Sequence, residues 1–244
     1  MIKGILFDKD GTLIPFHDFW HAVYTDVFKS FAHDWQIPLT LLDELKAACG
    51  FGEAHFEKES LLQHASTRHL LRQWETALSF HQLPDGTSCS FERLSELLTH
   101  HSTLPHRSIQ PLPGVVDTLA HLKKSGKRLG IATADTLHST RFSLSQAGLM
   151  NYFHFIGADD TVSAGKPSPE IARAFFRQEG LHPHEVVMVG DSLSDLAFAR
   201  QADTHFIGIE TCYNDSAGFR SAGALTVAAF DDILPLIITW ERVS

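Results

Sequence analysis

From about residue 110 onward, short apolar runs alternate with segments of amphipathic helical pattern. Strands and helices that alternate in this way form right-handed crossovers, which place the strands parallel in one sheet. The expected strands are IKGILF at residues 2–7, then KRLGIATAD, YFHFIGADD, EVVMVGDS, THFIGIE and LTVA. The pattern therefore predicts an α/β fold built on a doubly wound parallel sheet.

The expected helices between these strands are PLPGVVDTLAHLKKSG, STRFSLSQAGL, SPEIARAFFRQEGL and SDLAFARQA, and FDDILPLIITW closes the chain. In SPEIARAFFRQEGL we expect Ser168 to be the N-cap, because Pro169 suits the first helical position.

A block of different character separates the first strand from the rest. Phe16, Trp20, Val23 and Val27 recur at helical spacing, and later segments repeat that pattern without a convincing strand. We therefore expect a helical domain at residues 15–108, inserted into a core formed by residues 1–14 and 109–244.

Composition excludes some functions. The chain has 244 residues, a net charge of -9 and no long basic run, which argues against a nucleic-acid partner. No apolar stretch approaches the ~18 residues that a membrane helix needs, and no leader pattern precedes the first strand. Cys49, Cys89 and Cys212 are far apart, as is typical of unpaired thiols in a reducing compartment. We expect a cytoplasmic protein, either a monomer or a homodimer, that binds neither nucleic acid nor membrane.

Polar clusters follow the expected strands. They are Asp8–Thr12, Thr133–Asp135, the loop around Lys166, and Gly190–Asp195. In an open parallel sheet the ligand crevice lies outside the carboxyl ends of the strands. These clusters should therefore meet at one edge of the sheet.

The carboxylates in these clusters favour a hard cation. Asp8, Asp10, Asp191 and Asp195 would repel one another without one, and Mg²⁺ prefers oxygen ligands and shares them with phosphate. No HExxH motif or cysteine pair points to zinc.

The remaining polar groups suit phosphoryl transfer. Thr133 offers a hydroxyl, Ala134 a main-chain N–H and Lys166 a positive charge. Asp8 can attack phosphorus, and Asp10 can move the proton. Residues i and i+2 of an extended segment point to the same side, so both aspartates should face one substrate.

Four segments in order, FDKDGTL, IATAD, GKPSPE and VGDSLSDLAFA, resemble the motifs of the haloacid dehalogenase superfamily. The resemblance covers the whole chain and implies a Rossmann-like core. The helical insert resembles the small cap of phosphoglycolate-phosphatase-like members.

The resemblance implies a role for each motif residue. Asp8 is the nucleophile and a Mg²⁺ ligand, and Asp10 is the general acid/base whose main-chain carbonyl also binds the metal. The residues implied to hold the phosphoryl group are Thr133, Lys166 and the N–H groups near Asp10, Gly11 and Ala134. Asp191 is a metal ligand, and Asp195 either binds the metal through water or holds Lys166 in place.

Other readings stay open for some of these residues. Asp195 is also explained as a first-turn acid of a helix, and Lys166 as a solvated loop lysine. Asp135 either contacts substrate or caps a helix. His17 follows the first motif where the chain enters the insert, so it either lines the substrate entrance or is solvated.

We expect a Mg²⁺-dependent phosphatase that hydrolyses a small phosphorylated metabolite through an aspartyl-phosphate. The nearest alternative is a phosphoryl-transfer mutase of the β-phosphoglucomutase type. A carbon–halogen or carbon–phosphorus hydrolase and a non-catalytic binding protein on the same fold are further alternatives. Asp135 and Pro15 depart from the common pattern of relatives, which makes phosphoglycolate itself a less secure substrate.

Overall fold

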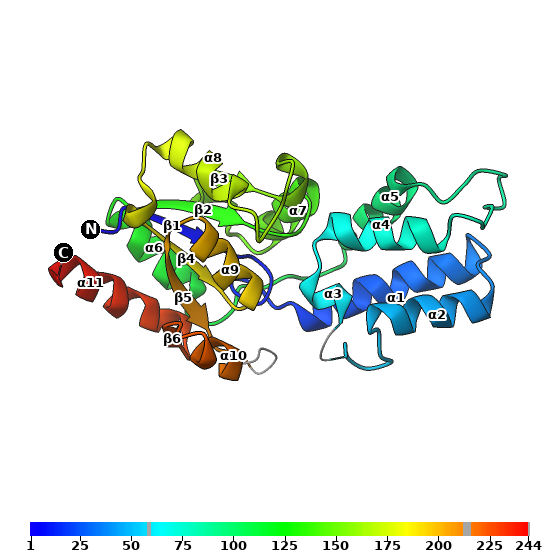
Figure 1. Cartoon of the computed structure of the whole chain (residues 1–244), viewed down its shortest axis with the longest axis horizontal. Coiled ribbons are helices and arrows are strands. Elements are labelled where there is room, and N and C mark those ends of the chain that lie inside the picture. The colour runs from blue at the N-terminus through cyan, green and yellow to red at the C-terminus, as the bar shows by residue number, and fades with distance from the viewer. Residues whose placement is uncertain (58–59, 212–215, 244) are drawn as a thin grey trace. The chain divides into compact units, whose positions relative to one another are not determined.

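A computed structural model describes residues 1–57, 60–211 and 216–243. The chain forms two compact units, one made of Met1–Pro15 with Ile109–Ser244 and the other of Phe16–Ser108 (Figure 1). The chain therefore leaves the first unit after Pro15 and returns to it at Ile109.

The first unit contains a six-stranded sheet in the order β3-β2-β1-β4-β5-β6, with every pair of neighbours parallel. The strands are β1 (Gly4–Phe7), β2 (Arg128–Ala132), β3 (Phe155–Gly157), β4 (Val186–Gly190), β5 (His205–Ile209) and β6 (Thr226–Val227). This topology confirms the predicted doubly wound α/β fold. It places β1 at the centre, between β2 and β4.

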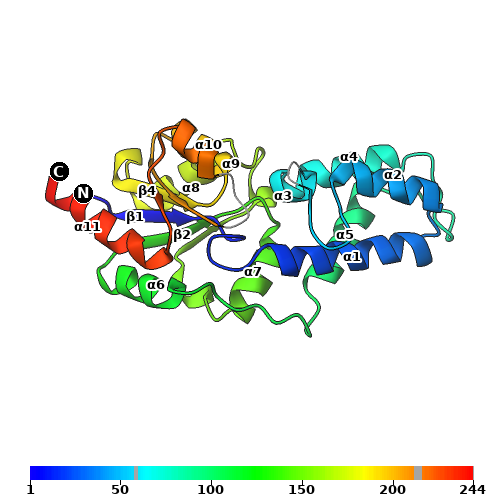
Figure 2. The same cartoon turned by 90° about the horizontal axis from the view of Figure 1, so that it is seen from below.

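Helices cover both faces of this sheet. They are α6 (Val115–Lys124), α7 (Leu137–Gln146), α8 (Glu170–Glu179), α9 (Leu193–Gln201), α10 (Ser216–Ser221) and α11 (Ile233–Val243). Short 3₁₀ turns lie at Met150–Tyr152, Asp159–Thr161, Pro183–Glu185 and Phe230–Asp232. Figure 2 shows α8 and α9 on one face and α6 and α11 on the other.

The central strands are apolar on both faces because both are covered. On one face Leu6 and Met188 pack with Phe175 of α8 and Phe198 of α9. On the other face the Phe7 ring stacks on Phe230 with 5.8 Å between ring centroids. β1 and β4 are therefore buried along their length, and this burial fixes where their carboxyl ends lie.

The prediction that Ser168 caps α8 is wrong. The helix begins at Glu170, with Pro169 at the N-cap position. The Ser168 N–H donates to the Gly165 oxygen at 2.9 Å, which closes a turn around the Lys166 loop. The Glu170 carboxylate accepts hydrogen bonds from Ser163, so it ties the first turn of α8 to this loop.

The second unit is helical, and the structure assigns no strand to its described residues. Its helices are α1 (His17–His33), α2 (Leu39–Cys49), α3 (Leu61–His64), α4 (Thr67–Ala77) and α5 (Phe91–Ser102). Trp74 is 1% exposed, and edge-to-face contacts join it to Tyr24, Phe28 and Phe31 of α1. This aromatic cluster is the centre of a core separate from that of the sheet.

Two further expectations concern the whole chain. Cys49 and Cys89 are buried free thiols, whereas Cys212 lies outside the described residues. Within the described residues, no helix has both the length and the apolar character needed to cross a membrane.

Candidate active site

The polar clusters meet because their strands are neighbours in the sheet. β2, β1 and β4 are adjacent, so the loops after Ala132, Phe7 and Gly190 leave the same edge. The Asp8 N–H donates to the Val189 oxygen at 2.8 Å, which extends the β1–β4 pairing to this residue. The position of Asp8 is thus fixed by the sheet.

Three carboxylates gather at this edge. One oxygen from each of Asp8, Asp191 and Asp195 lies within 4.8 Å of the other two. Burial raises the pKa of Asp8 to about 7, with Asp195 and Asp10 adding to the rise and Lys166 opposing it. Burial also raises the pKa of Asp191, and the charges of Asp8 and Asp195 add to this. The group is therefore costly to ionise unless a cation joins it.

Lys166 lies between two members of this group. Its Nζ is 2.6 Å from Asp8 Oδ1 and 2.6 Å from Asp195 Oδ1. Burial by itself would lower the pKa of Lys166, but the Asp195 and Asp8 carboxylates outweigh it and raise that pKa. Lys166 is therefore a buried ammonium, and not the solvated loop lysine of the alternative interpretation.

Asp195 contacts Lys166 and also lies in the first turn of α9, whereas its expected contact with a metal through water stays a prediction. Its Oδ1 accepts from Lys166, and its Oδ2 accepts from the Ser192 N–H and hydroxyl at the start of α9. The Asp195 N–H in turn donates to the Ser192 hydroxyl. Asp195 thus anchors Lys166 to a helix N-terminus.

Gly11 is needed for the turn after β1. Its φ is +82°, and a Cβ there would lie 2.3 Å from Asp191 Oδ2. The Gly11 N–H donates to the Ile14 oxygen at 2.8 Å, so this N–H is engaged in the turn and does not match the phosphate contact expected of it. The next residue, Thr12, donates its hydroxyl to Asp191 Oδ1 at 3.2 Å.

Asp10 lies outside the group of three carboxylates. β1 ends at Phe7, and the segment that follows is a turn and not extended chain. Asp10 Oδ2 is 2.7 Å from the Nζ of Lys9, whereas the ammonium that contacts Asp8 is that of Lys166. The expected role of Asp10 as a metal ligand concerns its main-chain carbonyl and stays a prediction.

The site contains a residue that the sequence reasoning missed. Lys9 is 0% exposed, and its Nζ lies 2.9 Å from Asp135 Oδ2 as well as next to Asp10. Burial alone would lower the pKa of Lys9, but Asp10 and Asp135 outweigh it and raise that pKa. The signal was present in the sequence, because a lysine directly after an apolar strand is expected to need a buried partner.

The structure also places Asp135. The N-cap of α7 is Thr136, whose hydroxyl accepts the Ser139 N–H, so the helix-cap interpretation of Asp135 is wrong. Asp135 is 5% exposed and is engaged by Lys9, and its Oδ1 accepts the Thr136 N–H at 2.7 Å. Its expected contact with substrate stays a prediction.

The expected phosphate-binding residues of the second motif lie at the end of β2. Thr133 is buried, and its hydroxyl oxygen accepts the Asp135 N–H at 3.2 Å. Ala134 follows it and is partly exposed. Their contact with a phosphoryl group remains a prediction.

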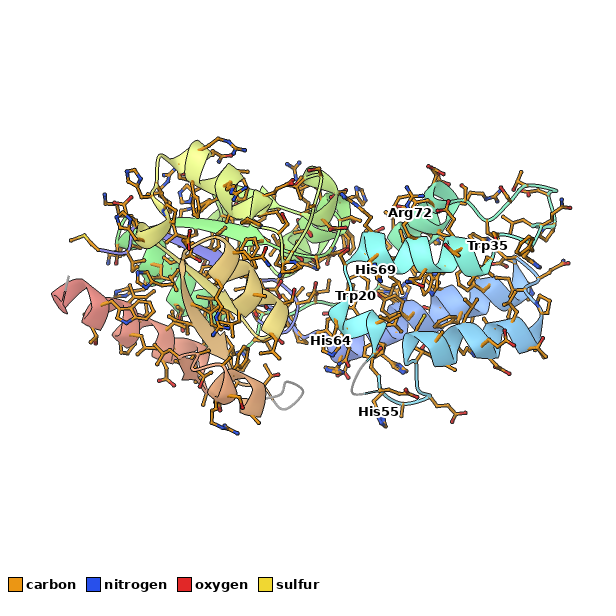
Figure 3. All side chains as sticks on the ribbon, in the orientation of Figure 1. Trp20, Trp35, His55, His64, His69 and Arg72 are labelled. Atoms are coloured by element: carbon orange, nitrogen blue, oxygen red, sulfur yellow. The ribbon has the colours of Figure 1, made fainter. Side chains whose placement is uncertain are left out.

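His17 is the first residue of α1 in the second unit. It is partly buried, and its Nε2 lies 3.1 Å from Gln63 Nε2. Burial lowers the pKa of His17. The side chains labelled in Figure 3 belong to the same unit, with His64 on α3 and His69 and Arg72 on α4. A substrate contact by His17 stays a prediction.

Comparison with known proteins adds to this geometry. A family model described as haloacid dehalogenase-like hydrolase matches residues 2–203. A phosphoglycolate phosphatase of Rhodospirillum rubrum is 30% identical over 239 residues, which covers 97% of this chain and 90% of that protein. The pyrophosphatase PpaX of Oceanobacillus iheyensis is 23% identical, which covers 90% of this chain and 89% of that protein. The structure of CbbY from Rhodobacter sphaeroides in complex with phosphate has the same fold, with a TM-score of 0.71 at 24% identity over 96% of each chain.

Proposed function

The chain belongs to the haloacid dehalogenase-like hydrolases, and we propose that it is a Mg²⁺-dependent phosphatase that acts on a small phosphorylated metabolite. The observation that carries the proposal is the buried carboxylate of Asp8, which lies against the Lys166 ammonium and beside Asp191 and Asp195. A carboxylate so placed at the end of a central strand is suited to attack phosphorus, with positive charge near the phosphoryl oxygens.

The carboxylate group fits a hard divalent cation. Asp8, Asp191 and Asp195 supply oxygen atoms, which Mg²⁺ prefers, and burial together with mutual repulsion raises the pKa of Asp8 and of Asp191. We expect Asp8, Asp191 and the Asp10 carbonyl to hold the ion, with Asp195 binding it through water. Mg²⁺ bound there would neutralise negative charge on the phosphoryl oxygens.

The reaction takes place in two halves. A carboxylate oxygen of Asp8 attacks phosphorus, and the bond from phosphorus to the leaving oxygen breaks. The Asp10 carboxyl group donates its proton to that oxygen, so the alcohol leaves and the phosphoryl group stays on Asp8. Asp10 then takes a proton from water as the water oxygen attacks phosphorus. The bond to Asp8 breaks, and inorganic phosphate leaves.

The other residues of the site orient the phosphoryl group. Lys166 provides a fixed ammonium, and Thr133 a hydroxyl held in place at the end of β2. We expect the Ala134 N–H to be a further donor. These groups are held before substrate arrives, so little reorganisation is needed during the reaction.

The identity of the metabolite depends on the second unit, which we propose to act as a cap that excludes water. The relatives named above act, by their names, on phosphoglycolate and on pyrophosphate. We propose a small phosphate ester of this size range. A cytoplasmic location is part of the same proposal.

The test is phosphate release from a panel of phosphorylated metabolites and an aryl phosphate, with and without Mg²⁺. Asp8→Asn should abolish release, because the amide cannot form the phosphoenzyme. Asp117→Asn, at an exposed position on α6, is the matched control and should keep wild-type activity. Full activity in Asp8→Asn would refute the mechanism, and isomerisation of a hexose phosphate without phosphate release would favour a mutase.

A further inference from the structure

We propose that Lys9 and Asp135 form a buried positioning pair that holds the proton-transfer carboxylate of Asp10 in place. The inference rests on the proposed phosphatase function and extends it to two residues for which that mechanism has no role. The observation behind it is a fully buried ammonium held between two carboxylates, which come from the loops after β1 and β2.

The contacts of Lys9 carry the first step of the argument. Its Nζ is 2.7 Å from Asp10 Oδ2 and 2.9 Å from Asp135 Oδ2. The two partners are 11% and 5% exposed, and Lys9 itself is 0% exposed. Burial of an ammonium is costly unless it is paired and hydrogen-bonded. The Asp10 and Asp135 carboxylates must therefore stay close to the Lys9 ammonium for the buried charge to be tolerated.

Asp135 is itself held by hydrogen bonds on its side chain and on its main chain. Its Oδ1 accepts the Thr136 N–H at 2.7 Å, and Thr136 is the N-cap of α7. The Asp135 carbonyl accepts the Asp159 N–H at 2.9 Å. The carboxylate that faces Lys9 is thus fixed by a helix terminus and by the turn after β3.

The same residue also contacts the expected phosphate hydroxyl. The Asp135 N–H donates to the Thr133 hydroxyl oxygen at 3.2 Å. Asp135 therefore links Asp10, through Lys9, to the hydroxyl that we expect to bind the phosphoryl group. The pair should set the distance between the proton-transfer group and the phosphorus atom.

The site contains a second lysine with the same arrangement. Lys166 bridges Asp8 and Asp195, as Lys9 bridges Asp10 and Asp135. In both cases one carboxylate is proposed to form or break bonds in the reaction, as Asp8 and Asp10 do, and the other is anchored at a helix terminus. The repeated arrangement supports a positioning role for Asp135 like that of Asp195.

A positioning role predicts dependence on the leaving group. A substrate whose leaving group is basic, such as phenyl phosphate, needs proton donation by Asp10, whereas 4-nitrophenyl phosphate needs it much less. Lys9→Met removes the ammonium but keeps a similar side-chain length. We expect it to lower kcat/KM roughly 100-fold for phenyl phosphate, and by less than about 10-fold for 4-nitrophenyl phosphate.

A second variant tests whether Lys9 positions Asp10 or only balances the negative charge of Asp135. Lys9→Met leaves Asp135 buried without its ammonium, which endangers folding. Lys9→Met combined with Asp135→Asn removes that charge, and we expect it to fold with an unfolding temperature near wild type. It should still show the selective loss with phenyl phosphate. Arg128→Met, which removes an ion pair with Glu179 where β2 begins, is the control and should leave both rates unchanged.

The outcomes distinguish this inference from the proposed function. If the wild type releases no phosphate, the proposed function and this inference both fail. If the wild type is active and depends on Asp8, but the double variant regains wild-type rates, Lys9 only balances the charge of Asp135. Equal losses with both substrates would show a general structural defect. Either result overturns the positioning role and leaves the phosphatase proposal intact.

Discussion

The carboxylate of Asp191 accepts a hydrogen bond from the Thr12 hydroxyl and lies close to the carboxylates of Asp8 and Asp195. Burial is the main reason that the pKa of Asp191 is raised, and the charges of Asp8 and Asp195 raise it further. The Thr12 hydroxyl and the Lys166 ammonium oppose this rise. A pKa raised in the folded state means that ionisation opposes folding. For Asp8, the loss in the free energy of unfolding therefore grows as pH rises from near the ordinary pKa of 3.8 through about 7.

This residue therefore gives a prediction about stability without metal. At about pH 8 and without Mg²⁺, Asp191→Asn should unfold a few degrees above wild type, because ~1 kcal/mol corresponds to roughly 2–4 °C in a chain of this size. The difference should shrink as pH falls, because protonation of Asp191 in the wild type removes the charge that opposes folding. Thermal unfolding followed by circular dichroism measures both.

The same variant should lose its response to the metal. Mg²⁺ should raise the unfolding temperature of the wild type, because the proposed metal site exists only in the folded chain, and should raise that of Asp191→Asn much less. The asparagine keeps an oxygen for the Thr12 hydroxyl, so the variant preserves that contact. A variant less stable than wild type at pH 8 would contradict the argument.

At the scale of elements, an ion pair joins β1 and β4 at the end of the sheet away from the candidate active site. Glu185 precedes β4 and Lys3 precedes β1, and their side chains lie 2.5 Å apart. The Lys3 ammonium and the His182 N–H lower the pKa of Glu185 from 4.5 to about 2. A lowered folded-state pKa gives stability that is present above the ordinary value and is lost as pH falls toward about 2.

Glu185→Gln should therefore lower the unfolding temperature at about pH 7, and the gap to wild type should narrow as pH falls toward about 3. Thermal unfolding at several pH values checks this. Glu96→Gln, at an exposed position of α5, controls for the loss of one negative charge. If the difference in unfolding temperature between wild type and Glu185→Gln widened as pH falls, the ionised Glu185 carboxylate would not be what stabilises the folded state.

Most elements of this fold could be predicted from periodicity alone. The apolar runs became strands and the amphipathic segments became helices, because burial on one or two faces imposes a fixed spacing. The four motifs identified the family correctly, and strand adjacency brought their residues to one edge. These inferences depend on local patterns and on rules of topology.

The differences from expectation arose in two ways, from a partner that is distant in the chain and from loops that close their own turns. Lys9 and Asp135 are separated by 126 positions, and no local pattern indicates that they meet. Pro169 took the N-cap position from Ser168 because the Lys166 loop closes its own turn first. The Gly11 N–H bonds within its turn, which the spacing of the motif does not reveal.

At the scale of the whole molecule, the described residues of the second unit form a hydrophobic core separate from the one that packs between the sheet and helices α8 and α9. The second unit contains Trp20, Trp35 and Trp74, and the buried Trp74 packs against aromatic rings of that unit. Trp74→Ala should cost about 3–5 kcal/mol, because it leaves a large cavity. We expect the loss to be confined to the second unit.

Amide hydrogen exchange measured by mass spectrometry checks this prediction. Protection should fall in α1, α4 and α5 of Trp74→Ala and should be unchanged in β1 and β4. Trp74→Phe, which keeps most of the volume, is the matched control. Equal loss of protection in the sheet would show that the two units unfold as one.

The central position of β1 has a consequence for synthesis of the chain. β1 ends at Phe7, yet its partners begin at Arg128 and Val186. All of the second unit, which ends at Ser108, is translated before either partner strand. The strand that leads into the proposed nucleophile is thus translated well before its partners and is paired late. Until then its apolar residues are exposed, and how long they stay exposed depends on the rate of translation.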